Sequence, residues 1–357
     1  MTTTRRSLLA ASALAIGLAI GAPAQADEKH VAFVSFTQDI TDMYGQILRG
    51  MERRLEAEGF DYRITTAAPQ GADDFAGMDR ILADIATIRP DYAVVGGASF
   101  ELIMDRVKEI QDAGSTVIVI DVLPESLDYE PVVDPLTWVA VDHHRMGIVG
   151  GTWIGERFCE EGTNPIKIAL FNGTAASEIS QLRMGGAMEA IREVAEGCGA
   201  EVEVVNEVFA DFSRERSYNL VQTVITAHPD LDLIIGANSN TALGIMDGLD
   251  ASGRLEGGPK ILGMGGQLDE MAAICRGDIA AAGFRDAQRM GFVTADSIMA
   301  HADGREGEVE KVTIAELPIL YDCDTVFENV PFAMLDNDGF RNLIDQATWD
   351  EYRATQE

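Results

Sequence analysis

The sequence predicts an α/β fold: two doubly wound parallel-sheet lobes joined by a multi-strand hinge. Short apolar, β-rich runs alternate with amphipathic helical stretches along most of the chain. The strands lack polar alternation, which is typical of parallel strands covered by helices on both faces. The 35 glycines in 357 residues exceed the usual share of ~7%. They fit many tight turns between strands and helices.

The first series of elements predicts one lobe. Its strand 117–120 is entirely apolar, as expected for a strand buried on both faces. The stretch 123–137 is rich in proline and acidic residues, so we expect it to cross to a second lobe. The series comprises strands 31–36, 62–65, 92–96 and 117–120, and helices 43–58, 74–88 and 100–113.

A second series of the same kind predicts the other lobe. Its helix 287–301 is expected to return to the first lobe, followed by an extended segment 311–321. The series comprises helices 146–158, 183–195, 214–227, 242–251 and 268–276, and strands 168–171, 201–207, 231–237, 260–264 and 280–285. We therefore expect an N-terminal lobe of residues 27–125 and 287–315, and a C-terminal lobe of residues 126–286 and 316–357.

Residues 1–26 have the pattern of a cleaved export signal. Arg5 and Arg6 precede an apolar stretch at 8–20, and small residues at 24–26 predict cleavage after Ala26. The apolar stretch is shorter than the ~20 residues of a bilayer-spanning helix, although a membrane anchor remains the alternative. The paired arginines fit a twin-arginine signal, which exports folded chains, as well as an ordinary one.

The four cysteines are then expected in an oxidising compartment. Cys159 and Cys198 each follow the end of a predicted helix. Successive helices of a parallel α/β layer end at the same edge, so we predict a Cys159–Cys198 disulfide, with Cys275–Cys323 as a second. Four buried thiols are the alternative. No CxxC pair is present, so no metal or redox motif is predicted.

The charge excludes one class of partner. With 59 acidic and 27 basic residues the net charge is −32, and loss of residues 1–26, with two arginines and no acid, would make it −34. Such a surface repels nucleic acid. None of the five histidines follows a predicted strand, and HExxH, GxSxG and phosphate-loop motifs are absent. We therefore expect no enzymatic activity, no cofactor and no metal site.

The candidate binding residues follow predicted strands, because ligands of open α/β sheets bind at the carboxyl ends of the strands. Arg183 and Arg285 each present a planar fork of donors suited to paired oxygens, with a surface position as the alternative. Asp121 is expected to accept hydrogen bonds from hydroxyl groups, or else to cap a turn. Tyr44 is expected to stack on an apolar sugar face, or else to lie in the core.

Four motifs together resemble the sugar-binding type of bacterial periplasmic binding proteins. They are VDHHRMG at 141–147, AHPDLD at 227–232, NTALGIMD at 240–247 and GMGG at 263–266. The resemblance implies a periplasmic receptor whose two lobes close around a small polyhydroxylated ligand. That ligand would be a sugar, sugar acid or polyol, delivered to a membrane ABC permease.

Within that family, the site residues resemble those of the periplasmic autoinducer-2 receptors, which hold a borated furanosyl diester with two arginines. This implies an alternative role as a furanosyl-signal sensor coupled to a membrane sensor kinase. In hexose and pentose receptors, the positions of Asp121 and Asn238 also contact ligand, whereas Gly265 replaces an aspartate that grips sugar hydroxyls. The implied ligand contacts are Asp39, Thr41, Tyr44, Asp121, Arg183, Asn238, Ser239, Asn240 and Arg285.

Overall fold

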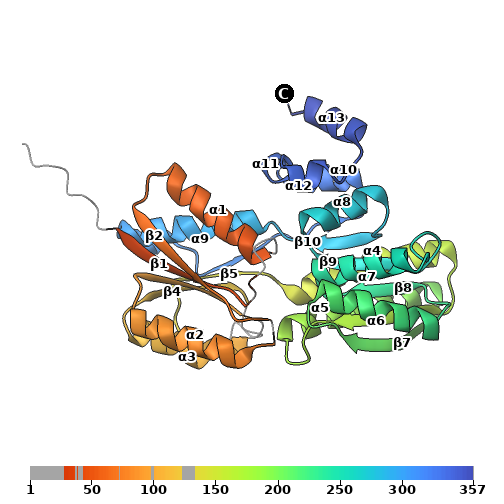
Figure 1. Cartoon of the computed structure of the whole chain (residues 1–357), viewed down its shortest axis with the longest axis horizontal. Helices are drawn as coiled ribbons and strands as arrows, with labels where there is room; N and C mark the ends of the chain where they lie inside the picture. The colour runs from red at the N-terminus through yellow and green to blue at the C-terminus, as the bar shows by residue number, and fades with distance from the viewer. Residues whose placement is uncertain are drawn as a thin grey trace, which may run out of the picture.

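The computed structural model describes residues 28–36, 38, 43–71, 73–97, 100–122 and 133–356, without the side chains of residues 100–102. The expected signal at 1–26, the candidate residues Asp39 and Thr41, and most of the expected crossover 123–137 lie outside the described residues. Two α/β lobes stand side by side, and the C-terminal helices lie on the second one (Figure 1). The predicted fold class is confirmed.

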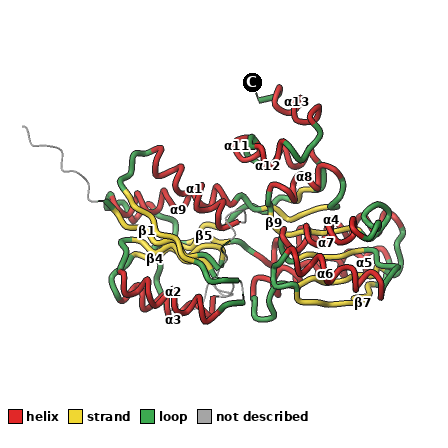
Figure 2. The backbone as a smooth tube through the Cα atoms, in the orientation of Figure 1, coloured by secondary structure: helices red, strands yellow, loops and turns green. Residues whose placement is uncertain are grey.

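The first lobe is a six-stranded parallel sheet with strand order β11-β5-β4-β3-β1-β2. Helices cover both faces, α1 with α9 on one and α2 with α3 on the other (Figure 2). The elements are β1 (Lys29–Val34), α1 (Met43–Ala57), β2 (Tyr62–Ala67), α2 (Phe75–Ile88), β3 (Tyr92–Gly96), α3 (Phe100–Asp112), β4 (Thr116–Asp121), β5 (Thr137–Ala140), α9 (Ala287–Ala302), the 3-10 turn η1 (Glu306–Glu308) and β11 (Val312–Ile314).

The second lobe repeats this plan with strand order β12-β10-β9-β8-β6-β7. Only β12, at the edge, runs antiparallel among its described strands. The elements are α4 (His143–Glu161), β6 (Ile166–Asn172), α5 (Glu178–Cys198), β7 (Val202–Phe209), α6 (Arg214–Ala227), β8 (Leu233–Gly236), α7 (Ser239–Ala251), β9 (Lys260–Gly265), α8 (Leu268–Arg276), β10 (Ala281–Phe284) and β12 (Ile319–Leu320).

Three segments cross between the lobes: β5 to α4 at residues 141–142, β10 to α9 at 285–286, and β11 to β12 at 315–318. The third crossing is hydrogen-bonded to the ends of the strands that precede the other two, since Ala315 N donates to Ala140 O of β5 (2.9 Å) and Phe284 N of β10 donates to Pro318 O (2.9 Å). The first crossing differs from the expected boundary at 125. The four-residue strand β5 pairs with β4 and extends the first sheet to Ala140.

The C-terminal extension, residues 323–354, packs on α8 of the second lobe (Figure 1). It consists of α10 (Cys323–Asn329), α11 (Phe332–Leu335), α12 (Asp338–Arg341) and α13 (Gln346–Ala354). Its buried Phe340 and Trp349 join the hydrophobic core of that lobe. The sequence analysis predicted none of these helices.

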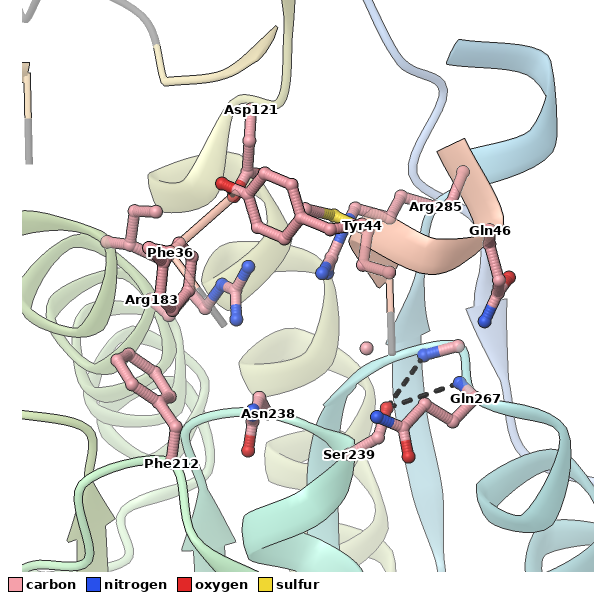
Figure 3. A pocket seen from close by; sticks show the side chains of 15 residues that line it. Phe36, Tyr44, Gln46, Asp121, Arg183, Phe212, Asn238, Ser239, Gln267 and Arg285 are labelled. Carbon is pink, nitrogen blue, oxygen red and sulfur yellow. Dashed lines mark hydrogen bonds between the residues drawn. The ribbon is translucent and has the colours of Figure 1, made fainter. Parts of the chain in front are cut away.

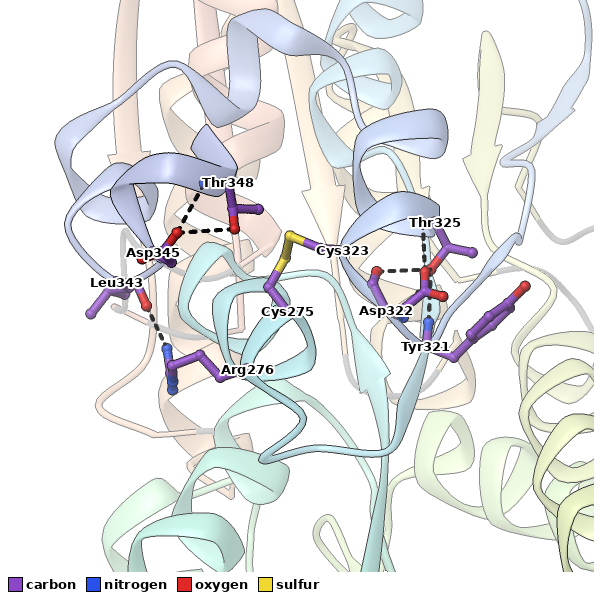
Figure 4. Close-up of a disulfide and its surroundings, with 9 residues drawn as sticks. All are labelled: Cys275, Arg276, Tyr321, Asp322, Cys323, Thr325, Leu343, Asp345 and Thr348. Carbon is purple, nitrogen blue, oxygen red and sulfur yellow. Dashed lines mark hydrogen bonds between the residues drawn. A yellow bond between two sulfur atoms is a disulfide. The ribbon is translucent and has the colours of Figure 1, made fainter. Parts of the chain in front are cut away.

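Both predicted disulfides are confirmed. Cys275–Cys323 joins the end of α8 to the start of α10 (Figure 4). Cys159–Cys198 joins the ends of α4 and α5, as the argument from neighbouring helices required. No described helix is long and apolar enough to cross a bilayer.

Helices α4 and α5 approach one another through glycines. A Cβ atom on Gly147 would lie 2.1 Å from the carbonyl oxygen of Arg183, and one on Gly151 would lie 2.4 Å from that of Ala187. Any side chain at these positions would push the helices apart. The glycines therefore fix Arg183 on α5 relative to His143 on α4.

Candidate ligand-binding site

A pocket of about 510 Å³, part of it open to solvent, lies between the lobes at the carboxyl ends of their strands. Both lobes contribute polar groups and aromatic rings to its wall (Figure 3). The lining residues are Phe36, Met43, Tyr44, Gln46, Asp121 and Ala287 from the first lobe, Ile179, Arg183, Phe212, Asn238, Ser239, Gly265, Gly266 and Gln267 from the second, and Arg285 at the crossing from β10 to α9.

Arg183 lies on the second turn of α5, which begins one turn before the expected start of this helix. Its guanidinium is buried: Nη1 donates to the carbonyl oxygen of Ala237 (2.8 Å) and Nε to Nδ1 of His143 (3.2 Å). Burial and the nearby Arg285 lower the pKa of Arg183 to about 9. The group is still protonated at neutral pH. Arg183 thus brings a positive charge to the pocket and ties α5 to the end of β8.

Asp121 ends β4 in a left-handed conformation, with φ 71°. Its Oδ2 accepts a hydrogen bond from the hydroxyl of Tyr44 (3.1 Å). Burial alone would raise the pKa of Asp121, but the neighbouring His143, Arg285 and Arg183 outweigh burial and hold the pKa below its ordinary value. Asp121 is therefore a carboxylate at neutral pH, facing the two arginines.

His143 links Asp121 to Arg183. Its Nε2 lies 3.0 Å from the carbonyl oxygen of Asp121, while Nδ1 accepts from Arg183. Burial and then the charge of Arg183 lower the pKa of His143, against the opposing effect of Asp121. The imidazole is therefore neutral at neutral pH, with its proton on Nε2, and the positive charges near Asp121 are the two arginines.

Arg285 follows β10 and is only 6% exposed. Its Nε donates to the thioether sulfur of Met43, and its Nη1 lies 4.0 Å from that of Met146. Thioethers are weak acceptors. Within the described part of the chain, no carboxylate forms an ion pair with Arg285. Figure 3 shows both guanidinium groups directed into the space between Tyr44, Asn238 and Ser239.

The floor of the pocket is a network around α7 and α8. The Asn238 side chain caps α7 by accepting from the backbone N–H of Thr241 (2.9 Å). Ser239 Oγ accepts from the backbone N–H of Gly266 (3.0 Å) and donates to Glu270 (2.6 Å). A Cβ atom on Gly265 would lie 1.8 Å from Ser239 Oγ, so the close approach of this loop requires glycine.

Glu270 lies behind this floor and is fully buried. Burial raises the pKa of Glu270 to about 7, although the hydrogen bonds from Ser239 and Gly266 act in the opposite direction. Its Oε1 has no hydrogen-bond partner among the described residues. Glu270 supports the floor from below.

Aromatic rings form one side of the pocket. Phe36 packs edge-on against Tyr44, with ring centroids 5.0 Å apart, and its centroid lies 6.1 Å from that of Phe212 in the opposite lobe. Aromatic rings suit the apolar faces of sugar rings. The pocket therefore combines charged groups, an amide and ring faces.

The structure brings six predicted site residues together at this pocket: Tyr44, Asp121, Arg183, Asn238, Ser239 and Arg285. Asn240, on the first turn of α7, is not part of the lining. The sequence analysis missed Gln46, Phe212, His143 and Glu270. His143 and Phe212 each lie three residues after the end of a strand, β5 and β7 respectively, so a strand-end rule finds them once both strands are placed correctly. Glu270 and Gln46 lie inside helices and carry no such signal.

Comparison with known proteins places this arrangement in context. Residues 31–306 match the family model described as the periplasmic binding protein domain. The chain is 20% identical over 270 residues to the ribose import binding protein of Salmonella typhimurium, covering 76% of this chain and 83% of the relative. It is 22% identical over 320 residues to the multiple sugar-binding periplasmic receptor of Rhizobium radiobacter, covering 85% and 86%.

Solved structures share the fold. An ABC transporter solute binding protein from Agrobacterium vitis with bound D-fucose superposes with a TM-score of 0.70 at 18% identity, covering 88% of this chain and 100% of that one. One from Bacillus halodurans with bound myo-inositol gives a TM-score of 0.69 at 19% identity, covering 85% and 98%.

Proposed function

Because the chain belongs to the periplasmic binding protein domain family, we propose that it captures a small sugar-like ligand between its two lobes and delivers it to an ABC import permease. The observation that carries this proposal is the interlobe pocket, where Asp121 and Tyr44 of one lobe meet Arg183 and Asn238 of the other, with Arg285 at the crossing. A ligand held by both lobes stabilises the closed form, because only contacts that differ between open and closed states shift the balance.

A ligand screen tests this function. A thermal-shift panel of sugars, sugar acids and polyols, with and without borate, should contain compounds that raise the Tm. A ligand at 100 times its Kd adds ~2.7 kcal/mol to the free energy of unfolding. A panel in which no compound raises the Tm would contradict the proposal.

Binding without chemistry is part of the proposal. The relatives named above are binding proteins and receptors, and His143, beside Asp121, is occupied by Arg183 and a backbone carbonyl. Incubation with each stabilising sugar, followed by chromatography, should return the sugar unchanged. A time-dependent product would instead indicate an enzyme on this scaffold.

The family is periplasmic by its description, and we propose that residues 1–26 carry the chain there. Intact-mass analysis of the protein from a periplasmic extract should give a chain that begins at Asp27. Changing Arg5 and Arg6 to lysine separates the export routes. A twin-arginine signal loses export, whereas an ordinary signal retains it.

Transport is the proposed use of the captured ligand. Uptake of a radiolabelled ligand from the screen should fall in a strain that lacks the gene, and the wild-type gene should restore it. The named relatives are import and sugar-binding proteins. They do not favour the sensory role for autoinducer-2, so we do not propose it.

A further inference from the structure

We propose that the ligand is an anionic polyol, a sugar acid whose carboxylate pairs with Arg285. This inference rests on the proposed function and narrows its ligand class. It is carried by the charges around the pocket, by the partners of Arg285 and by the buried acceptors of Asp121 and Gln46.

The charges of the described lining residues do not balance. Among them, Arg183 and Arg285 are cationic, and Asp121 is the one carboxylate. The buried ring of His143 accepts a hydrogen bond from Arg183, which opposes its protonation. Glu270 lies behind the lining and is bonded to Ser239 and Gly266, and burial favours its protonated form. Positive charge is therefore in excess among these described groups, and an anionic ligand would offset it.

Arg285 is the cation without a matching acceptor. Arg183 uses two of its nitrogens on His143 and Ala237, whereas Arg285 contacts the thioethers of Met43 and Met146. A buried charge is costly unless it is paired and hydrogen-bonded. A carboxylate matches the guanidinium fork with two parallel hydrogen bonds. Arg285 is thus 6% exposed, aimed into the pocket and lacking the partner that its chemistry prefers.

The other groups of the pocket suit the hydroxyl groups and apolar faces of a sugar-like ligand. Gln46 Oε1 is buried and has no hydrogen-bond partner among the described residues. Asp121 Oδ1 is buried too, and Nε2 of His143 lies 3.4 Å from it, farther than from the carbonyl oxygen of Asp121. Both atoms are acceptors, which suit the hydroxyl donors of a ligand. Phe36, Tyr44 and Phe212 supply an apolar wall. A chain or ring of hydroxyls with a carboxylate at one end satisfies both the acceptors and Arg285.

Matched pairs of compounds test the inference by titration calorimetry on the full mature chain. The pairs are D-galacturonate with D-galactose, D-glucuronate with D-glucose, and D-gluconate with sorbitol. We expect at least one acid to bind about tenfold to a hundredfold more tightly than its neutral partner, the range of one charged hydrogen-bond pair.

Two other outcomes are informative in different ways. Binding of neutral members with equal or weaker binding of every acid would overturn the anionic ligand and leave the sugar-binding function standing. Absence of binding by all six compounds, together with a silent thermal-shift panel, would overturn the function itself.

Substitutions of Arg285 test whether the carboxylate of the ligand binds at this residue. Arg285→Gln should weaken binding of the preferred acid by about tenfold to a hundredfold more than it weakens binding of the neutral partner. Arg289→Gln, an exposed arginine in the next turn of the chain, is the matched control and should bind both as the wild type does. Arg285→Lys should recover part of the acid affinity, because it keeps the charge but loses the fork. Wild-type acid affinity in Arg285→Gln would overturn the assignment.

Discussion

The two pocket arginines differ in what each does for the empty protein. Arg183 supports the backbone through the carbonyl of Ala237, whereas the acceptors that the described residues offer Arg285 are sulfur atoms. Arg183→Gln should therefore unfold at a lower temperature than Arg285→Gln. We expect its free energy of unfolding to be lower by about 1–3 kcal/mol, because the buried carbonyl of Ala237 loses its donor. Differential scanning calorimetry without ligand measures this difference.

A second expectation concerns the stability of Arg285→Gln relative to the wild type. Because its charge has no carboxylate partner among the described residues and repels Arg183, Arg285→Gln should unfold at or above the wild-type temperature. If Arg285→Gln proved the less stable of the two variants, Arg285 would be a structural residue, and the distinction between the arginines would be wrong.

Glu270 predicts a pH dependence. Its pKa is raised to about 7 from a usual 4.5 by burial, with Asp269 adding to the shift and Ser239, Gly266 and Arg285 opposing it. Between these pH values the folded chain holds a proton that the unfolded chain has lost. The contribution of Glu270 to stability is therefore present below pH ~4.5 and lost as pH rises through ~7, by up to ~1.4 kcal/mol per pH unit.

Glu270→Gln keeps an oxygen for Ser239 and Gly266 but cannot ionise. The Tm of this variant minus that of the wild type should increase between pH 5 and pH 8, as followed by circular dichroism. The subtraction matters because His143, whose pKa is lowered, acts with the opposite sign below pH ~6.5. A difference that stays constant with pH would show that Glu270 is ionised in the folded protein throughout.

Residue type and position relative to the strands predicted Tyr44, Asp121, Arg183 and Arg285 from the sequence, and the family resemblance implied Asn238 and Ser239. These signals failed for His143, because strand β5 borders a proline-rich stretch and was not predicted. Without that strand, His143 is simply a residue at the start of a predicted helix. The chemistry of Asp121 depends on His143 and both arginines at once. No single sequence segment contains that arrangement.

The close packing of helices α4 and α5 determines where Arg183 lies in the pocket. Gly147→Ala should separate them, because its Cβ would meet the carbonyl of Arg183 at 2.1 Å. We expect a loss of about 1–3 kcal/mol in stability and weaker ligand binding, measured by chemical denaturation and calorimetry. Gly185→Ala is the control on α5: a Cβ there meets nothing within 4 Å, and helix propensity should stabilise it by up to ~1 kcal/mol. Equal behaviour of both variants would contradict the packing argument.

Long periodic elements were predicted well, and short ones were not. Apart from the nine-residue α8, the helices of both lobes have 13 or more residues, and their apolar faces are detected by a sequence pattern. Three helices of the C-terminal extension span only 4 to 7 residues, too short for a period to show. Asp322, Asn337 and Asp345 cap the starts of α10, α12 and α13.

At the level of the whole molecule, the alternation of apolar strands with amphipathic helices predicted the two lobes. The large excess of acidic residues predicts that the Tm depends on salt concentration. Raising NaCl from ~0.1 M to ~1 M shortens the Debye length from ~10 Å to ~3 Å and screens the repulsion among the excess carboxylates. Many ion pairs of the described surface are exposed, and each is worth only ~0–1 kcal/mol. The Tm should therefore rise.

Equal ionic strength of KCl should produce the same rise, because screening does not depend on the cation, and scanning calorimetry compares the two salts. A Tm that falls with both salts would mean that the surface ion pairs outweigh the net repulsion.

The three crossings between the lobes have a consequence for measured affinities. Residues 140–142 and 315–318 do not line the pocket. Because they join the two lobes, we expect them to influence how often the protein adopts its binding-competent arrangement. An observed dissociation constant equals the intrinsic one divided by that occupancy. A substitution in these segments can therefore change the apparent affinity many-fold without changing any atom that contacts the solute. Affinity can then evolve separately from selectivity.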